Sequence, residues 1–259
     1  MRKSQAELMS YWRGKVVRAT VAVMLVVGGG AASAAGVVSC PSEGPQSHAV
    51  YDYRVAPPNV IRVVEAYHFG PGVESLTKAA TTVFFGGDLA YTLRYFPNHH
   101  RALATLVRLA KREKTNRPRG TDRTVECSFE AGLQIAPDDG VVELLYGMWL
   151  ADLADTKGAA ARLERARENA PQGNANFQYN LGLGWITLGR YDDALTAAHI
   201  AYGLGYPLPG LRQKLEKAGK WRPLPAKAAE TPIVGSGEEK AAERTEKAGD
   251  PKADQPREE

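Results

Sequence analysis

The chain has 259 residues, of which 44% are hydrophobic, 24% charged and 8% aromatic, as in ordinary soluble globular proteins. This composition excludes collagen-like, cysteine-rich and wholly disordered proteins. The net charge of +4 comes from residues 1–39, where five basic residues face one acidic residue, because the other 28 basic and 28 acidic side chains cancel. The basic character therefore belongs to the N-terminus, and we expect no nucleic-acid partner.

Residues 1–39 have the pattern of an export signal. A basic stretch precedes the apolar residues 21–27, and the small residues 31–36 follow. These are the three parts of a signal peptidase substrate. Cleavage after Ala34 would release a soluble mature protein.

Two other interpretations of this N-terminus stay open. The 20 uncharged residues 19–38 are about long enough to span a bilayer, so they could form an uncleaved inner-membrane tether. Residues 37–40 resemble a lipobox, although twelve residues separate Cys40 from the apolar run. All three interpretations predict a periplasmic or otherwise exported protein.

Cys40 and Cys127 are the only cysteines. In an oxidising compartment an even number of cysteines favours a disulfide. We therefore expect a Cys40–Cys127 bridge, with two unpaired thiols as the alternative.

Residues 40–86 are predicted to form an N-terminal arm and a partial helical unit. Within them, residues 61–69 are rich in β-branched side chains and follow two prolines, so they could be a helix or a short strand. We favour the helix.

Residues 87–221 show helical patterning with regularly spaced prolines. Pro97, Pro137, Pro171 and Pro207 are 40, 34 and 36 residues apart, and a period near 34 indicates helical repeats. The unit 175–208 resembles a tetratricopeptide (TPR) repeat through Leu181, Gly182, Trp185, Tyr191, Ala194 and Ala201. The unit 140–173 matches less closely, through Gly147, Ala159, Ala166 and Pro171.

A third unit is degenerate, with helices expected at 98–114 and 124–136 around a loop at 114–120, and with a half-unit at 87–96 before it. Residues 208–219 would form a capping helix, as such stacks require. The resemblance therefore implies an all-α fold, with antiparallel helix pairs stacked as a short TPR-like α-solenoid with a C-terminal capping helix. Over about residues 50–221 the chain also resembles a group of exported bacterial TPR proteins that carry the string at 91–103, a group whose activity is unassigned.

The TPR resemblance implies a concave groove lined by the first helix of each repeat. Carried onto this chain, its lining is basic at one end and apolar at the other: Arg101, Arg108 and Arg112, then Leu144, Met148, Tyr179, Leu183 and Ile186. The predicted function is an exported adaptor or scaffold that binds a protein or peptide of the cell envelope, with an acidic partner favoured by the arginines. An alternative is that residues 41–70 fill the groove internally.

No catalytic or nucleotide-binding motif is present, so we predict neither an enzyme nor a cofactor. Glu65 and His68 lie three residues apart, would share one face of a helix, and could bind a metal together with His99. A metal-binding or enzymatic envelope protein built on these residues is the alternative function. The favoured interpretation is that His99 and the adjacent His100 make local contacts at a helix start, and that no metal is bound.

Two charged segments complete the chain. Residues 98–123 carry eight basic and two acidic side chains, a net charge of +6. They form either a solvated face or a binding surface for an acidic peptide, phospholipid headgroups or another anionic polymer of the envelope. Residues 222–259 have few large apolar side chains, which predicts a disordered charged tail.

Overall fold

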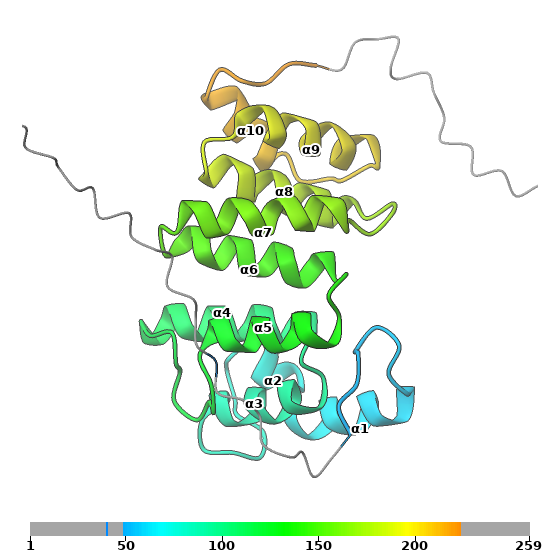
Figure 1. The fold of residues 1–259 in the computed structure, drawn as a ribbon, viewed down its shortest axis with the longest axis vertical. Coiled ribbons are helices and arrows are strands. Elements are labelled where there is room, and N and C mark those ends of the chain that lie inside the picture. Colours follow the sequence, from blue (N-terminus) through cyan, green and yellow to red (C-terminus); the bar gives the residue numbers. More distant parts are fainter. Residues whose placement is uncertain (1–39, 41–48, 224–259) are drawn as a thin grey trace, which may run out of the picture. The chain divides into compact units, whose positions relative to one another are not determined.

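The computed structural model describes Cys40 and residues 49–223. The predicted signal or tether in residues 1–39 and all but the first two residues of the predicted tail 222–259 lie outside the described residues. Within residues 49–223 the chain forms ten α-helices and no strand, so the predicted all-α class is confirmed (Figure 1). None of these ten helices combines the length and apolar character that crossing a bilayer requires.

The N-terminal part contains α1 (Pro58–His68), α2 (Pro71–Glu74) and α3 (Phe85–Tyr95). The helical interpretation of residues 61–69 is thus confirmed for all but the last residue. Proline stands at the first position of α1 and of α2, where its fixed φ suits a helix start and its missing N–H costs nothing. The helix α1 packs on α3, and α2 packs on α3 and α4.

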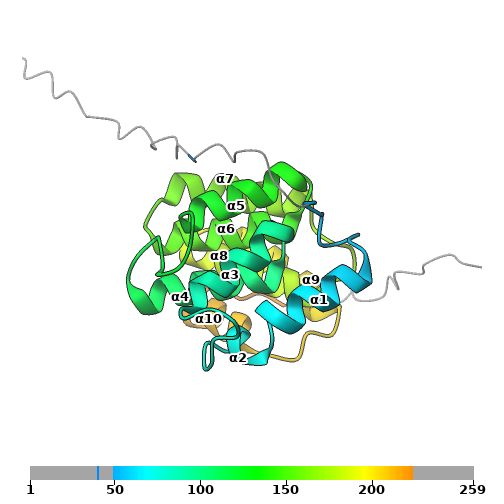
Figure 2. The same cartoon turned by 90° about the horizontal axis from the view of Figure 1, so that it is seen from below.

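The remaining helices form successive pairs. They are α4 (His100–Glu113) and α5 (Val125–Ile135), α6 (Gly140–Asp152) and α7 (Thr156–Glu168), α8 (Ala175–Thr187) and α9 (Tyr191–Gly203), followed by the single helix α10 (Gly210–Lys217). The pairs α6–α7 and α8–α9 have the most extensive internal packing, and α8 also contacts both α6 and α7. In Figure 2, α5 and α7 lie along one side of this stack, with α1 and α2 toward the opposite side. The described residues therefore form antiparallel helix pairs stacked as an α-solenoid, and α10 packs against α8 and α9 at its C-terminal end.

The regular prolines are explained by the way each repeat begins. A proline ends the preceding helix, and a polar side chain two or three residues later accepts a backbone N–H of the next helix. His99 accepts from Ala102, Asp139 from Val142, and Asn174 from Phe177. Asp and Asn N-caps of this kind each stabilise a helix by about 1 kcal/mol.

Small residues lie where helices approach closely. Gly147 faces Leu163 of α7, and Gly182 faces Leu211 of α10. Most of the other residues of the predicted repeats are fully or almost fully buried: Ala159, Ala166, Leu181, Trp185, Ala194 and Ala201. Tyr191 and Pro171 are partly exposed.

The predicted disulfide is confirmed. Cys40 and Cys127 are bonded, with their Cα atoms 5.3 Å apart. The bond fixes residue 40 to the first turn of α5, where the side chain of Thr124 caps the helix by accepting the N–H of Cys127.

Candidate functional site: the groove face and the histidine–carboxylate network

The basic end of the predicted groove is occupied by the protein's own chain. Arg101 donates two hydrogen bonds to the Glu74 carboxylate, Nε to Oε1 at 2.8 Å and Nη2 to Oε2 at 2.5 Å. Arg108 donates to the carbonyl oxygen of Glu74 at 2.5 Å, and Arg112 donates to that of Leu76 at 2.9 Å. The hydrogen bonds from Arg101 hold the pKa of Glu74 below its usual value.

The segment that meets these arginines also belongs to the core. Phe69 and Val73 are each 1% exposed and pack in the same cluster as Leu103 and Leu106 of α4. The guanidinium of Arg101 lies over the Phe69 ring at 5.3 Å. Residues 69–76 are therefore an integral cover of α4. The sequence-based alternative expected residues 41–70 to fill the groove. The segment that contacts these arginines is residues 69–76, which lies slightly later in the chain.

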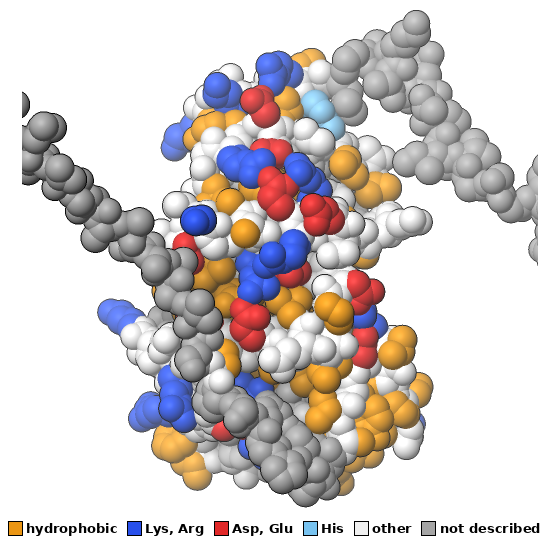
Figure 3. Space-filling view, viewed as in Figure 1, with side chains coloured by type: hydrophobic (Ala, Val, Ile, Leu, Met, Phe, Trp, Pro, Cys, Tyr) orange, Lys and Arg blue, Asp and Glu red, His pale blue; other side chains and the backbone are white. Residues whose placement is uncertain are grey.

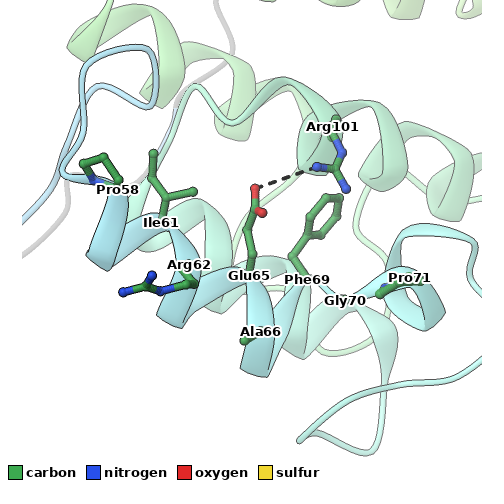
Figure 4. Close-up of a pocket in the computed structure, with 9 residues that line it drawn as sticks. All are labelled: Pro58, Ile61, Arg62, Glu65, Ala66, Phe69, Gly70, Pro71 and Arg101. Atoms are coloured by element: carbon green, nitrogen blue, oxygen red, sulfur yellow. Dashed lines mark ion pairs between the residues drawn. The ribbon is translucent and has the colours of Figure 1, made fainter.

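A cavity of about 460 Å³ opens beside this cover, between α1 and Arg101 (Figure 4). Its walls are mainly apolar, from Pro58, Ile61, Ala66, Phe69 and Pro71. Figure 4 shows the Glu65 side chain directed toward Arg101, whose nearer nitrogen lies 3.9 Å from Glu65 Oε1, while Arg62 points away. Glu65 is thus the polar group between this cavity and the interior.

Behind Glu65 lies a buried network centred on His99, which is 0% exposed. Glu65 Oε1 accepts from His99 Nε2 at 2.9 Å and from the Tyr53 hydroxyl at 2.9 Å. The Tyr53 and His99 rings are stacked obliquely with centroids 4.0 Å apart. Because His99 Nδ1 accepts the Ala102 N–H, its Nε2 carries the proton.

Burial controls the ionisation of this network. Desolvation lowers the pKa of His99, and this effect outweighs the opposing influence of Glu65. Desolvation and the Glu65 carboxylate together raise the pKa of Tyr53 to about 12. The neutral imidazole is therefore the stable form in the fold.

The structure brings together only two of the three residues proposed for a metal. His68 is directed elsewhere: its Nδ1 lies 3.2 Å from Asp88 Oδ1 and 2.9 Å from Thr81 Oγ1, and its ring stacks on Tyr91. Among the described residues, no group of three or more His, Cys, Asp or Glu side chains is arranged to hold a metal ion. His68 therefore does not complete a site with Glu65 and His99.

Neighbouring histidines diverge, as two successive side chains at a helix start should. His99 contacts Glu65, whereas His100 Nε2 lies 2.8 and 2.9 Å from the two carboxylate oxygens of Asp139. Asp139 is 2% exposed. Desolvation would raise its pKa, but hydrogen bonds from His100 and Asn98 keep that pKa below its usual value.

Sequence reasoning missed the polar groups that connect the N-terminal arm to these helix starts. Asn98, which is 0% exposed, donates to Asp52 Oδ1 at 2.7 Å and to Asp139 Oδ2 at 3.0 Å, and accepts the Tyr53 N–H at 2.8 Å. The signal was present in the sequence: a polar pair directly follows Pro97, and another directly follows Pro137. One residue of each pair takes part in the hydrogen bond from Asn98 to Asp139.

The apolar half of the predicted groove requires one correction. Leu144 is only 4% exposed and belongs to the core cluster with Phe177 and Leu181, so it does not line an open surface. The reason is that α6 is in contact with α4, α5, α7 and α8 and is therefore apolar on most of its circumference. The other four residues, Met148, Tyr179, Leu183 and Ile186, are half-buried and lie at the edge of the same core.

Comparison with known proteins adds no relative to this picture. No family model matches the chain, and no curated protein or solved structure does so significantly.

Proposed function

We propose that the protein is an exported, TPR-type adaptor or scaffold that binds a segment of another cell-envelope protein. The observation that carries this proposal is the apolar strip formed by Met148, Tyr179, Leu183 and Ile186. These side chains come from α6 and α8, the first helices of two successive pairs, and each is only half-buried. Apolar side chains left partly open on consecutive repeats are suited to cover an apolar face of a bound segment.

The structure changes the part expected of the arginines. Because Glu74 and the carbonyl groups of residues 74 and 76 already accept from Arg101, Arg108 and Arg112, an acidic partner would have to share or replace these contacts. Recognition in this proposal therefore rests first on the apolar strip. The export signal pattern of residues 1–39 supports an interaction in the periplasm or elsewhere outside the cytoplasm, and binding of this kind needs no catalytic residue or cofactor.

The test is affinity capture from envelope extracts with matched variants. The groove variant is Met148→Gln with Leu183→Gln, which makes the strip polar. The control is Ile200→Gln with Leu204→Gln, which changes two exposed side chains at the end of α9 that are 44% and 37% exposed. Because the strip residues touch the core, the melting temperature of each variant is measured first.

The proposal predicts one or more partners that wild type and control capture alike and that the groove variant loses. The same partners should be captured by a His99→Gln protein, which leaves the strip unchanged. If a folded groove variant captures the same proteins as wild type, the strip is not the binding surface and the adaptor proposal in this form is wrong.

A further inference from the structure

Two loops next to the start of α3 form one exposed surface. Val83 is 85% exposed and Phe84 is 43% exposed. The Arg119 guanidinium lies over the Phe84 ring at 5.2 Å. At Gly86 the backbones approach so closely that an added Cβ would collide with the Arg119 carbonyl oxygen. Residues 84–87 and 119–121 are thus packed together. We call Val83, Phe84 and Arg119, with the exposed Lys114 and Arg117 of the same loop, the loop patch.

The loop patch combines apolar side chains with an excess of positive charge. Residues 111–123 contain six basic and two acidic side chains, a net charge of +4. Among the described residues, Lys114, Arg117 and Arg119 form no ion pair with a carboxylate: Arg117 donates to the Asp122 carbonyl, and Arg119 lies over an aromatic ring. Basic side chains lie beside hydrophobic ones at the lower left of the view in Figure 3.

The disulfide lies beside the same basic loop. Cys127 lines a cavity of about 470 Å³ together with Asn116, Arg117 and Asp122 of the basic loop. Its bonded partner, Cys40, is the described residue nearest in sequence to the uncharged stretch 19–38, which ends two residues before it. Residue 40 is therefore held next to the basic loop by its bond to Cys127.

We propose that the loop patch binds the surface of an anionic lipid membrane. Aromatic and aliphatic side chains at the tip of an interfacial surface enter the boundary between headgroups and acyl chains, while Lys and Arg contact phosphate. Val83 and Phe84 take the first role, and Lys114, Arg117 and Arg119 the second. A second copy of this chain fits less well, because pairing two loop patches would oppose like charges.

The test uses the full chain with a tryptophan reporter, mixed with vesicles of phosphatidylglycerol and phosphatidylcholine whose acyl chains are brominated. Bromine quenches tryptophan that enters the interface. Phe84→Trp places the reporter in the patch, and Ile200→Trp is the matched control, because Ile200 on α9 is 44% exposed and Phe84 is 43% exposed. The quenching of wild-type protein, which has four tryptophans, is subtracted from both.

We expect added quenching in Phe84→Trp and none in Ile200→Trp. Arg117→Glu with Arg119→Glu, added to Phe84→Trp, should remove most of it while circular dichroism shows an unchanged fold. Raising the salt concentration from 0.1 to 1 M should also weaken it, since the screening length falls from about 10 Å to about 3 Å.

Four results would overturn the proposal. The first is the absence of added quenching in Phe84→Trp, and the second is equal quenching in both reporter proteins. The third is equal quenching with purely phosphatidylcholine vesicles. The fourth is a blue shift of the Phe84→Trp reporter emission that grows with protein concentration in the absence of lipid. The last result would show that the patch joins two copies of the protein. This test is independent of the apolar strip, so the adaptor proposal stands or falls separately.

Discussion

The imidazole of His99 donates its Nε2–H to Glu65 at 2.9 Å while its Nδ1 accepts the amide N–H of Ala102 at 3.1 Å. Both ring nitrogens are thus satisfied in the neutral form. Protonation at Nδ1 would replace an acceptor by a donor that faces another donor. One side chain therefore caps α4 and binds α1 to it, and only when it is neutral.

This arrangement predicts that stability falls as the pH is lowered through the histidine range. Because burial lowers the pKa of His99, the unfolded chain binds the proton more readily, and stability is lost as the pH falls below about 6.5. The loss cannot exceed about 1.4 kcal/mol per pH unit, which is the limit for one proton. Urea unfolding between pH 5 and 8 measures it. His99→Gln should show a clearly flatter profile, and identical profiles for the two proteins would contradict the assignment.

The carboxylates of Asp88 and Asp139 do not affect the pH dependence of stability between pH 5 and 8. Asp88 and Asp139 also have lowered pKa values, so the stability they contribute is present above about pH 4 and is lost only below it. Their effect lies outside the window used for His99.

A glycine at the start of α6 is expected to be more sensitive than those in the repeat signature. A Cβ added to Gly140 would collide with the carbonyl oxygen of Asn169, whereas at Gly182 the nearest atom belongs to the flexible Leu211 side chain. Gly140→Ala should therefore destabilise the protein by about 1–3 kcal/mol, and more than Gly182→Ala does.

The matched control for Gly140 is Gly203, at the end of α9, where no atom lies within 4 Å of an added Cβ. Gly203→Ala should be neutral or stabilise by up to about 1 kcal/mol, because alanine loses less backbone entropy. Chemical unfolding of the three variants checks the order. Equal losses for Gly140→Ala and Gly203→Ala would mean that α6 and the residue 169 turn are not packed as described.

The pairing of helices could be predicted from the sequence because it depends on local signals. The prolines at 97, 137 and 171 mark helix ends, and the small residues Gly147 and Gly182 mark helix contacts. Both kinds of signal act within about one repeat. The disulfide could also be predicted, since the chain has two cysteines and an export signal pattern.

The candidate site was less predictable because its contacts join distant segments. Arg108 binds the carbonyl of Glu74, and Leu144 packs toward α8. Both contacts depend on which elements surround α2 and α6 in three dimensions. A TPR position assigned to a groove says which face of one helix a residue occupies. It does not say whether another segment covers that face.

The disulfide predicts a stability that depends on redox conditions. Cys127→Ser should lower the free energy of unfolding by about 2–4 kcal/mol, because the bridge closes a loop between residues 87 positions apart and restricts the unfolded chain. Under reducing conditions wild type and variant should unfold alike. Mass analysis of oxidised protein without reductant supplies the control, and two free thiols there would exclude the bridge.

The C-terminal boundary can be tested by substitution and truncation. The Trp221 ring packs against His199, Tyr202 and Arg212, and Arg222 pairs with Asp192. Trp221→Ala should therefore cost about 2 kcal/mol, less than the 3–5 kcal/mol typical of a fully buried aromatic residue.

Deleting residues 224–259, by contrast, should leave the melting temperature nearly unchanged if that segment is the predicted tail. Calorimetry of the full chain and of the protein lacking residues 224–259 measures the two melting temperatures. A large loss on deletion would show that the tail contributes to the folded unit.

The bond between Cys40 and Cys127 also decides how mechanical tension would pass through the protein. Consider a force applied between the chain ahead of residue 40 and the C-terminal end of the fold. It enters α5 directly through the sulfur atoms. The helices α1 to α4 lie inside the covalent loop and carry none of that load, whereas α5 to α10 lie in series with it. The His99 network and the loop patch would thus keep their geometry under a force that begins to separate the repeats that carry the apolar strip.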